Sequence, residues 1–178
     1  MVKTAYQVTL RTSTQTWAEH SAAWDDGPTW NKVWDSKVPP KVRMFLWRAC
    51  LNCLPTRDKL HQRRVNVDTW CEFCLQQTET VHHILWECPF GQNVRALFSG
   101  RTQKCNNVAS DFFILFRQMQ RKLSQQELEK WAVTAWAIWT VRNKFYFQHY
   151  QTNPKVIANM ASGLLEEYQR LMDTQGQN

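Results

Sequence analysis

The chain has 178 residues, of which 43% are hydrophobic, and a formal net charge of +7. This length suits one domain, and the five Gly and six Pro are too few for a disordered chain. Six Cys in a chain of this size exclude a dense disulfide scaffold. No apolar run marks a signal peptide, and the most apolar stretch, residues 131–141, is shorter than the ~20 residues of a membrane span. We therefore expect an intracellular protein, nuclear or cytoplasmic, without a membrane partner.

Helical patterns begin near the first residue. Residues 2–11 suit a short helix, and the Ser- and Thr-containing stretch 12–28 is typical of a loop. Trp30 and Trp34 are four positions apart, which places both indoles on one helix face. The Pro39-Pro40 pair then ends that segment and opens the next, because Pro is favoured in a first helical turn.

The next helix is predicted over residues 41–53, and a basic helix follows it. Its apolar residues recur at helical spacing and form one stripe: Val42, Phe45, Leu46, Ala49, Cys50 and Cys53. Pro55 lies just past its end, and Thr56 can cap the helix that follows. The densest run of cations in the chain comes next: Arg57, Lys59, Arg63 and Arg64. Such a run indicates either a solvated helix face or a surface that contacts phosphates.

The C-terminal half also has helical periodicity. Short helices are predicted over residues 90–98 and 108–123. Ser124 and Glu127 form a capping box that opens a long helix through about Gln148, apolar on more than one face and therefore buried. Asn153-Pro154 opens a last helix that runs to about Met172. No alternating strand pattern extends beyond residues 65–67, so the sequence predicts an all-α fold, an irregular helical bundle with helices 41–53 and 127–148 in its core.

A metal-ligand motif lies between these two halves. Cys71, Cys74, His83 and Cys88 follow the spacing C-x2-C-x8-H-x4-C. Three thiols and one imidazole satisfy a tetrahedral Zn²⁺, whereas a catalytic zinc keeps one position open for water. The spacing therefore predicts one structural zinc ion held by four protein ligands.

Two alternatives remain at this stage. Cys50, Cys53, Cys71 and Cys74 also fit a four-cysteine zinc spacing, although core packing explains the first two without a metal. The second alternative concerns His82 and His83, because in a straight α-helix neither one shares a face with Cys88. The helix must therefore end or distort before Cys88, and Pro89 disfavours helical geometry at that residue. Spacing alone does not choose between the two histidines.

Charge and aromatic content leave two function classes open. A basic balance favours nucleic acid or other anionic partners, and aromatic side chains of zinc modules can stack single-stranded bases. The candidates beside the motif are Trp70, Phe73 and Trp86, which can alternatively pack over the metal site. The second class is a protein-interaction module in which the charge is incidental. No nucleophile–base pair or carboxylate pair indicates an enzyme.

The order of several motifs resembles the zinc-binding domain that follows the polymerase in plant LINE-type (non-LTR) retrotransposon reverse transcriptases. The similar segments are Lys3-Thr4-Ala5-Tyr6, Trp30-x3-Trp34, the run from Val38 to Arg48, Leu54-Pro55-Thr56 with Leu60 and Arg63, and the ligand motif with Glu79, Thr80 and Pro89. In that pattern the histidine falls on His83. Trp139-x2-Arg142-Asn143 resembles a motif that leads toward a ribonuclease H domain. One departure is Arg95-Ala96, where the family usually has a Trp.

The resemblance implies an accessory module that binds Zn²⁺ and is not catalytic. It divides the chain into a zinc-binding domain, residues 1–100, and a helical extension packed on it, residues 101–178. The polymerase would need paired aspartates between strands, and Asp25-Asp26 lies in a predicted loop. We expect single-stranded RNA or DNA to bind through Arg57, Lys59, Arg63, Arg64, Trp70 and Phe73. The alternative is a protein-interaction or scaffold module domesticated from such an element.

Overall fold

The computed structural model describes residues 27–98 and 109–175 of the chain. Their elements are α2 (Gly27–Trp34), α3 (Pro40–Cys50), α4 (Arg57–Gln62), a π-helical turn η1 (His83–Glu87), α5 (Pro89–Arg95), α6 (Phe112–Lys122), α7 (Gln125–Gln148) and α8 (Pro154–Gln175). Within these two ranges the only strand-like pairing is an isolated bridge between Trp70 and Thr78. The all-α prediction is therefore confirmed. The helix expected over residues 2–11, most of the 12–28 loop and Cys105 lie outside the described residues.

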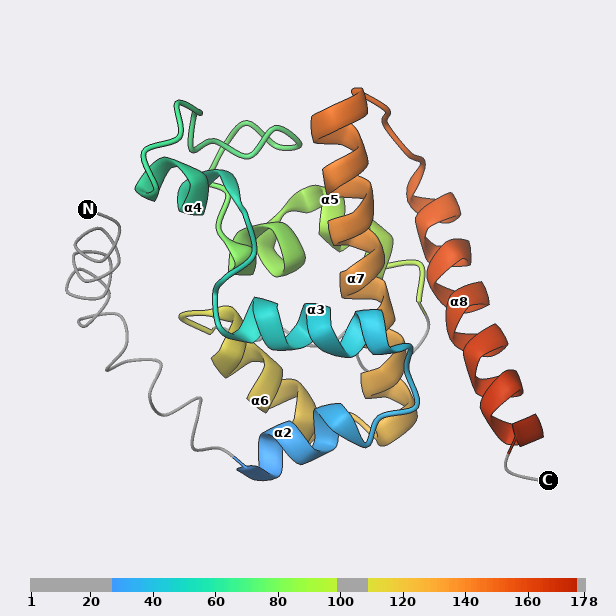
Figure 1. The fold of residues 1–178 in the computed structure, drawn as a ribbon. Helices are drawn as coiled ribbons and strands as arrows, with labels where there is room; N and C mark the ends of the chain where they lie inside the picture. Colours follow the sequence, from blue (N-terminus) through green and yellow to red (C-terminus); the bar gives the residue numbers. More distant parts are fainter. Residues whose placement is uncertain (1–26, 99–108, 176–178) are drawn as a thin grey trace, which may run out of the picture.

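The long helix α7 is the centre of the fold. It contacts α3, α5, α6, α8 and η1 (Figure 1), and it buries side chains on several of its faces, including Trp131, Ile138 and Trp139. Its first turn is fixed by the predicted capping box, since the Glu127 amide donates to Ser124 Oγ at 3.3 Å and Glu127 Oε2 accepts from the Ser124 amide at 2.9 Å. Both predictions for this helix, its bounds and its burial, are confirmed.

Helix α3 lies across α7 and ends earlier than its apolar stripe suggests. Pro39 is its N-cap and Pro40 its first residue, as predicted. The residues Val42, Phe45, Leu46, Ala49 and Cys50 are buried, whereas the predicted continuation to Cys53 is wrong. Asn52 has a left-handed backbone with a φ of 51°, a conformation that ends α-helices. Cys53 therefore leaves the stripe and is only half-buried.

Other boundaries differ by a few residues for local reasons. Helix α5 starts at Pro89 and ends at Arg95, before the predicted residue 98. Helix α6 starts at Phe112, where Asp111 accepts the Ile114 amide at 2.9 Å and acts as an N-cap that the periodicity did not indicate. In the last helix, α8, the Lys155 amide donates to Asn153 Oδ1 at 2.9 Å, which confirms the predicted cap.

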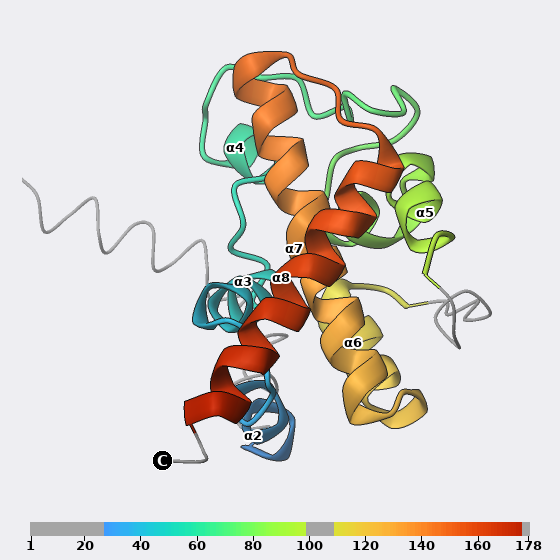
Figure 2. The ribbon, with the colours of Figure 1, turned by 90° about the vertical axis from the view of Figure 1, so that its right-hand side faces the viewer.

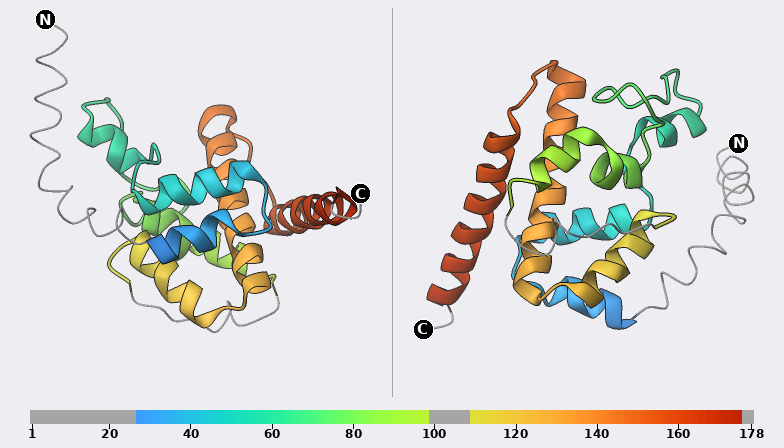
Figure 3. Two further views of the ribbon diagram at one scale, coloured as in Figure 1. Left: turned by 60° about the horizontal axis from the view of Figure 1, so that its bottom comes forward. Right: turned by 180° about the vertical axis from the view of Figure 1, so that it is seen from behind.

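The arrangement places the predicted ligand motif at one end of the molecule. Helix α8 packs along one side of α7 and crosses it obliquely, and α4 lies on the opposite side (Figures 1 and 2). Figure 3 shows α5 and α6 on the face of α7 that points away from the view of Figure 1. One cluster of buried side chains extends from Val33 in α2 to Leu165 in α8. Among the helices of the described ranges, none combines the length and hydrophobicity needed to cross a bilayer.

Candidate metal centre

The four predicted ligand atoms meet in one place. One donor atom each from Cys71, Cys74, His83 and Cys88 lies within 4.8 Å of the others. The Sγ atoms of Cys71 and Cys88 are 3.8 Å apart, and the Cys74 Sγ is 3.3 Å from His83 Nε2. A tetrahedral ion with Zn–S bonds of ~2.3 Å separates two sulfurs by about 3.8 Å. The spacing of the donor atoms therefore fits a tetrahedral metal ion.

The first two ligands lie on a segment that we call the ligand loop, residues 63–80. The Cys71 amide donates to the Gln77 carbonyl, and the Leu75 amide donates to the Cys71 carbonyl, both at 2.8 Å. Leu75 has a φ of 55°, a left-handed conformation that closes this tight turn. These bonds place the thiols of Cys71 and Cys74 on the same side of the loop.

The other two ligands are brought together by the π-helical turn η1. The Cys88 amide donates to the His83 carbonyl at 2.7 Å, five positions back along the chain. This wider turn lets His83 and Cys88 face the same side, which an α-helical turn does not. Cys88 itself has a ψ of 129° and has left helical geometry before Pro89. The distortion expected from the sequence is thus present, in the form of a π-helical turn.

The same turn chooses between the two histidines. The His83 side chain is buried, and its Nδ1 lies 2.9 Å from Gln77 Oε1. This bond orients the ring so that Nε2 faces the thiols, as partners of the second ring nitrogen do in metal sites. His82 does not belong to the ligand group, and its Nε2 lies 3.5 Å from Glu87 Oε1. The structure therefore places His83 in the group, in agreement with the family resemblance.

The rival four-cysteine site does not form among the described residues. The group of possible ligands contains neither Cys50 nor Cys53. Cys50 is buried in α3, where burial raises the pKa of its thiol well above the usual value. Cys50 therefore behaves as a small apolar core residue, which matches the packing interpretation of its place on the stripe.

Hydrogen bonding within the group shifts the pKa values of two thiols in opposite directions. The bond to Cys88, followed by burial, raises the pKa of Cys71 to about 12. The same bond lowers the pKa of Cys88, although burial opposes that shift. Either sulfur can be the donor of this bond. A divalent cation bound between them would favour the thiolate form of both.

Arg95 supports the π-helical turn, a role that the sequence analysis missed. Its guanidinium donates to the Leu85 carbonyl at 2.7 Å and to the Trp86 carbonyl. The end of a helix leaves carbonyls without helical partners, and Arg95 satisfies two of them. It also lies 4.2 Å from the Trp86 ring centroid, and burial lowers its pKa to about 10. The departure from the family pattern at Arg95-Ala96 therefore coincides with a residue that holds the last ligand turn.

A buried ion pair joins the ligand loop to α7. Glu79 and Arg142 are only 2% and 3% exposed, and Arg142 Nε donates to Glu79 Oε2 at 3.2 Å while its Nη2 donates to Oε1. Glu79 Oε1 also accepts the Arg57 amide at 2.9 Å. Both residues belong to motifs noted in the sequence, but nothing in the sequence indicated that they pair across 63 positions.

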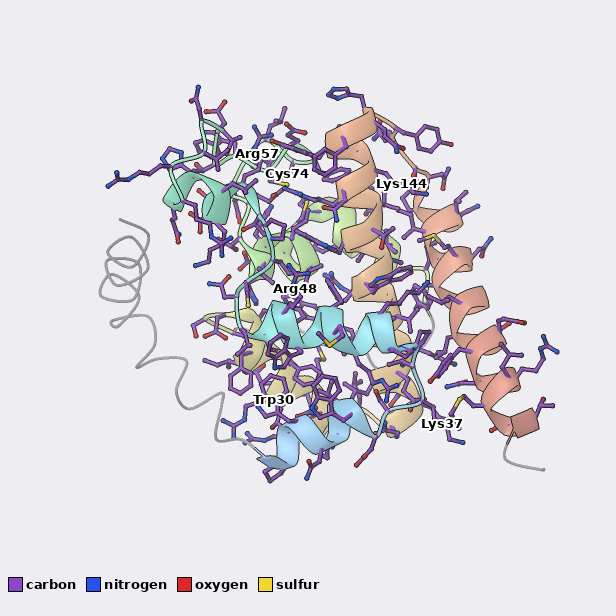
Figure 4. The ribbon with its side chains drawn as sticks, in the orientation of Figure 1. Trp30, Lys37, Arg48, Arg57, Cys74 and Lys144 are labelled. Atoms are coloured by element: carbon purple, nitrogen blue, oxygen red, sulfur yellow. The ribbon has the colours of Figure 1, made fainter. Side chains whose placement is uncertain are left out.

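The predicted nucleic-acid residues occupy two kinds of environment. Arg57 contacts the ligand loop, because it pairs with Glu72 and its Nε donates to the Asp68 carbonyl at 2.7 Å. Phe73 also packs inward, with its ring centroid 4.2 Å from that of Phe90. The outward-facing residues are Arg63, Arg64 and Trp70, which is 53% exposed, together with the half-buried Lys59. Figure 4 shows Arg57 and Cys74 at this end of the molecule. The third candidate aromatic, Trp86, is buried.

Comparisons with known proteins agree with the ligand geometry. A family model described as "zinc-binding in reverse transcriptase" matches residues 1–94. A protein of Arabidopsis thaliana that bears the name "Putative ribonuclease H protein" is 30% identical over 59 residues, which cover 33% of this chain and 10% of that protein. The chain thus spans about a tenth of the length of this relative. No solved structure matches the chain.

Proposed function

The chain belongs to the family of zinc-binding domains of reverse transcriptases, and on that premise we propose that it is a zinc-stabilised, non-catalytic accessory module that binds RNA or DNA. The observation that carries the proposal is the group of Cys71, Cys74, His83 and Cys88 beside a basic helix. The relative named for ribonuclease H supports an origin in a retrotransposon-type reverse transcriptase. A protein-interaction module domesticated from such an element is the alternative.

The metal in this proposal is one Zn²⁺ with a structural role. Four protein donors would complete its tetrahedral coordination, so no position would remain for a water molecule or a substrate. Three of the ligands are buried, and Cys74 is half-buried. Bound zinc would replace the hydrogen bonds among the thiols by coordination bonds and hold the ligand loop against η1.

Metal analysis of the purified protein tests this assignment. We expect about one zinc per chain, lost in Cys88→Ser and retained in Cys50→Ser and Cys53→Ser, which serve as matched controls. The assignment would be wrong if the Cys50 and Cys53 variants released the metal while Cys88→Ser kept it. Substitution of His82 by Ala should leave the zinc content unchanged, whereas His83→Ala should lower it.

Nucleic-acid binding is supported by the surface next to the metal centre. Lys59, Arg63 and Arg64 lie at α4 and its end, and the exposed Trp70 begins the adjacent ligand turn. Cations can contact phosphates, while an exposed indole can stack a base without regard to sequence. Arg57, bound to Glu72, would hold this surface in place and contribute less to binding.

Fluorescence anisotropy with labelled single-stranded RNA and DNA tests the binding. Affinity should fall with salt by a log–log slope of roughly −0.7 per phosphate contact. Replacing Lys59, Arg63 and Arg64 by Glu should weaken binding to all sequences about equally and flatten this slope. A matched control replaces Arg121, Lys130 and Lys155, exposed cations away from α4, by Glu. An α4 variant no weaker than this control would contradict the proposed surface, and a wild type without binding at low salt would favour the protein-interaction alternative.

A further inference from the structure

A groove lies between α3 and α7, away from the metal centre. It has a volume of about 600 Å³, within the range of ligand pockets, roughly 300–1,000 Å³. Helix α3 contributes Lys41 and Arg48 to its lining, and α7 contributes Lys144. None of the described residues that line it is acidic. Figure 4 shows Arg48 on α3 and Lys144 on the upper half of α7. The groove is therefore cationic without a compensating charge on its lining.

Aromatic side chains line the same groove as these cations. Lys41 Nζ lies 4.5 Å from the ring centroid of the half-buried Trp136. Phe147, near the end of α7, is 75% exposed. In the described part of the chain, the side chains of Arg48 and Lys144 form no hydrogen bond or ion pair, so both can contact a ligand. A large exposed ring beside unpaired cations is the pattern that single-strand binding surfaces use for bases and phosphates.

The groove continues the basic surface of α4. Burial raises the pKa of the Cys53 thiol, and Arg48, Arg63 and Lys59 each oppose that shift. The charges of these three cations therefore all act on the same thiol. Leu54, in the connection between α3 and α4, also lines the groove. The groove lining therefore reaches the connection that leads into the basic helix α4.

We propose that the α3–α7 groove is a second contact site for single-stranded nucleic acid, with phosphates at Arg48 and Lys144 and a base stacked on Phe147. This inference rests on the proposed function and extends it from the metal end of the molecule to its centre. The exposed ring favours nucleic acid over an acidic protein segment, because cations alone would satisfy carboxylates, whereas stacking requires a planar base.

Anisotropy titrations with a labelled oligouridine long enough to span both surfaces test the proposal. The double variant Arg48→Glu/Lys144→Glu should bind about tenfold more weakly or worse and lower the salt slope by roughly 1.4, two contacts at about 0.7 each. Phe147→Ala should weaken binding by about fivefold to one-hundredfold, and its exposed ring makes a loss of folding stability unexpected. The matched control is Arg121→Glu/Lys130→Glu, which makes the same change in net charge on exposed residues outside the groove lining.

The outcomes separate this inference from the function on which it rests. Absence of wild-type binding overturns both. A second outcome overturns the groove alone. In it, the wild type binds and the α4 reversal weakens binding, but the groove double variant binds no more weakly than its control. Polyglutamate provides the last comparison, because it carries charge without bases. The groove is a surface for acidic protein, and the proposal is wrong, if polyglutamate competes for the protein as well as unlabelled oligouridine does and Phe147→Ala changes the affinity for neither polymer.

Discussion

Helix α7 and the ligand loop are held by different interactions. Along α7, most buried side chains are apolar, and they pack against four other helices. Within residues 63–80, by contrast, the buried residues are Cys71 and Glu79, a metal-ligand candidate and one half of an ion pair. The free energy gained from apolar burial scales with the buried area, so it tolerates small shifts of the side chains. Metal coordination and ion pairing, by contrast, require defined distances and angles between the atoms involved. The stability of the ligand loop should therefore depend on a few polar contacts, and that of α7 mainly on its apolar packing.

Metal removal should separate the two regions most clearly. Closed zinc sites in small fingers contribute an apparent 10–16 kcal/mol on binding. Chelation, or Cys88→Ser, should raise amide exchange across the ligand loop and η1 while α7 stays protected, because α3, α6 and α8 still pack against it. Hydrogen exchange measured by mass spectrometry, with Cys50→Ser as control, would show this pattern. Equal protection around Cys71 with and without metal would contradict it.

Truncation of a core aromatic side chain should lower the stability of the helical core and leave the metal centre intact. Trp131 packs on Phe112 and Phe116, with ring centroids 5.7 and 6.0 Å away. Trp131→Ala should lower the free energy of unfolding by about 3–5 kcal/mol because it leaves a cavity. The folded fraction should still hold its full zinc content. Trp34→Ala, at an exposed indole, is the control and should cost far less in a denaturant titration.

Removal of Arg142 should affect both regions, since it connects them. Loss of one partner of a buried ion pair costs about 3–5 kcal/mol. We expect the lower end of that range for Arg142→Leu, because the Arg57 amide still donates to Glu79. The double variant Glu79→Leu/Arg142→Leu should recover part of the loss, as the remaining charge is gone. A double variant as unstable as the sum of the two single variants would show that the pair is not coupled.

The smallest effect is expected at the start of α7. Ser124→Ala removes the side chain that accepts the Glu127 amide, and loss of such a cap costs about 1 kcal/mol. Thermal denaturation should show a modest decrease in Tm, and metal content should not change. Gln126→Ala, in the same turn but without a capping role, provides the comparison. A change in zinc content for Ser124→Ala would mean that the two regions are coupled more tightly than their contacts indicate.

The features that could be predicted from the sequence differ between the helices and the ligand loop. Periodicity identified α3 and α7, and local pairs such as Ser124 with Glu127 fixed their starts, because these signals act over a few residues. The group of four candidate ligands could be predicted since coordination chemistry restricts both residue type and spacing. The early end of α3 depended on the backbone of Asn52, which no apolar pattern reports.

The missed contacts are those that join distant positions. Glu79 and Arg142 are 63 residues apart, so no local rule pairs them. Arg95 binds carbonyls that become available only once η1 has formed a π-helical turn. The sequence required a distortion between His83 and Cys88 but did not determine its form, since an early helix end and a wider turn both bring the ligands together.

The pairing of Glu79 with Arg142 also bears on which fragment of this chain can fold by itself. The family match ends at residue 94, before α7 begins. A piece excised there would carry a carboxylate whose partner stayed behind, and a set of helices without the one they pack around. A fragment that keeps the fold of the matched region therefore has to include α7 as well as the ligand segment, so the folding unit is longer than the region of family similarity.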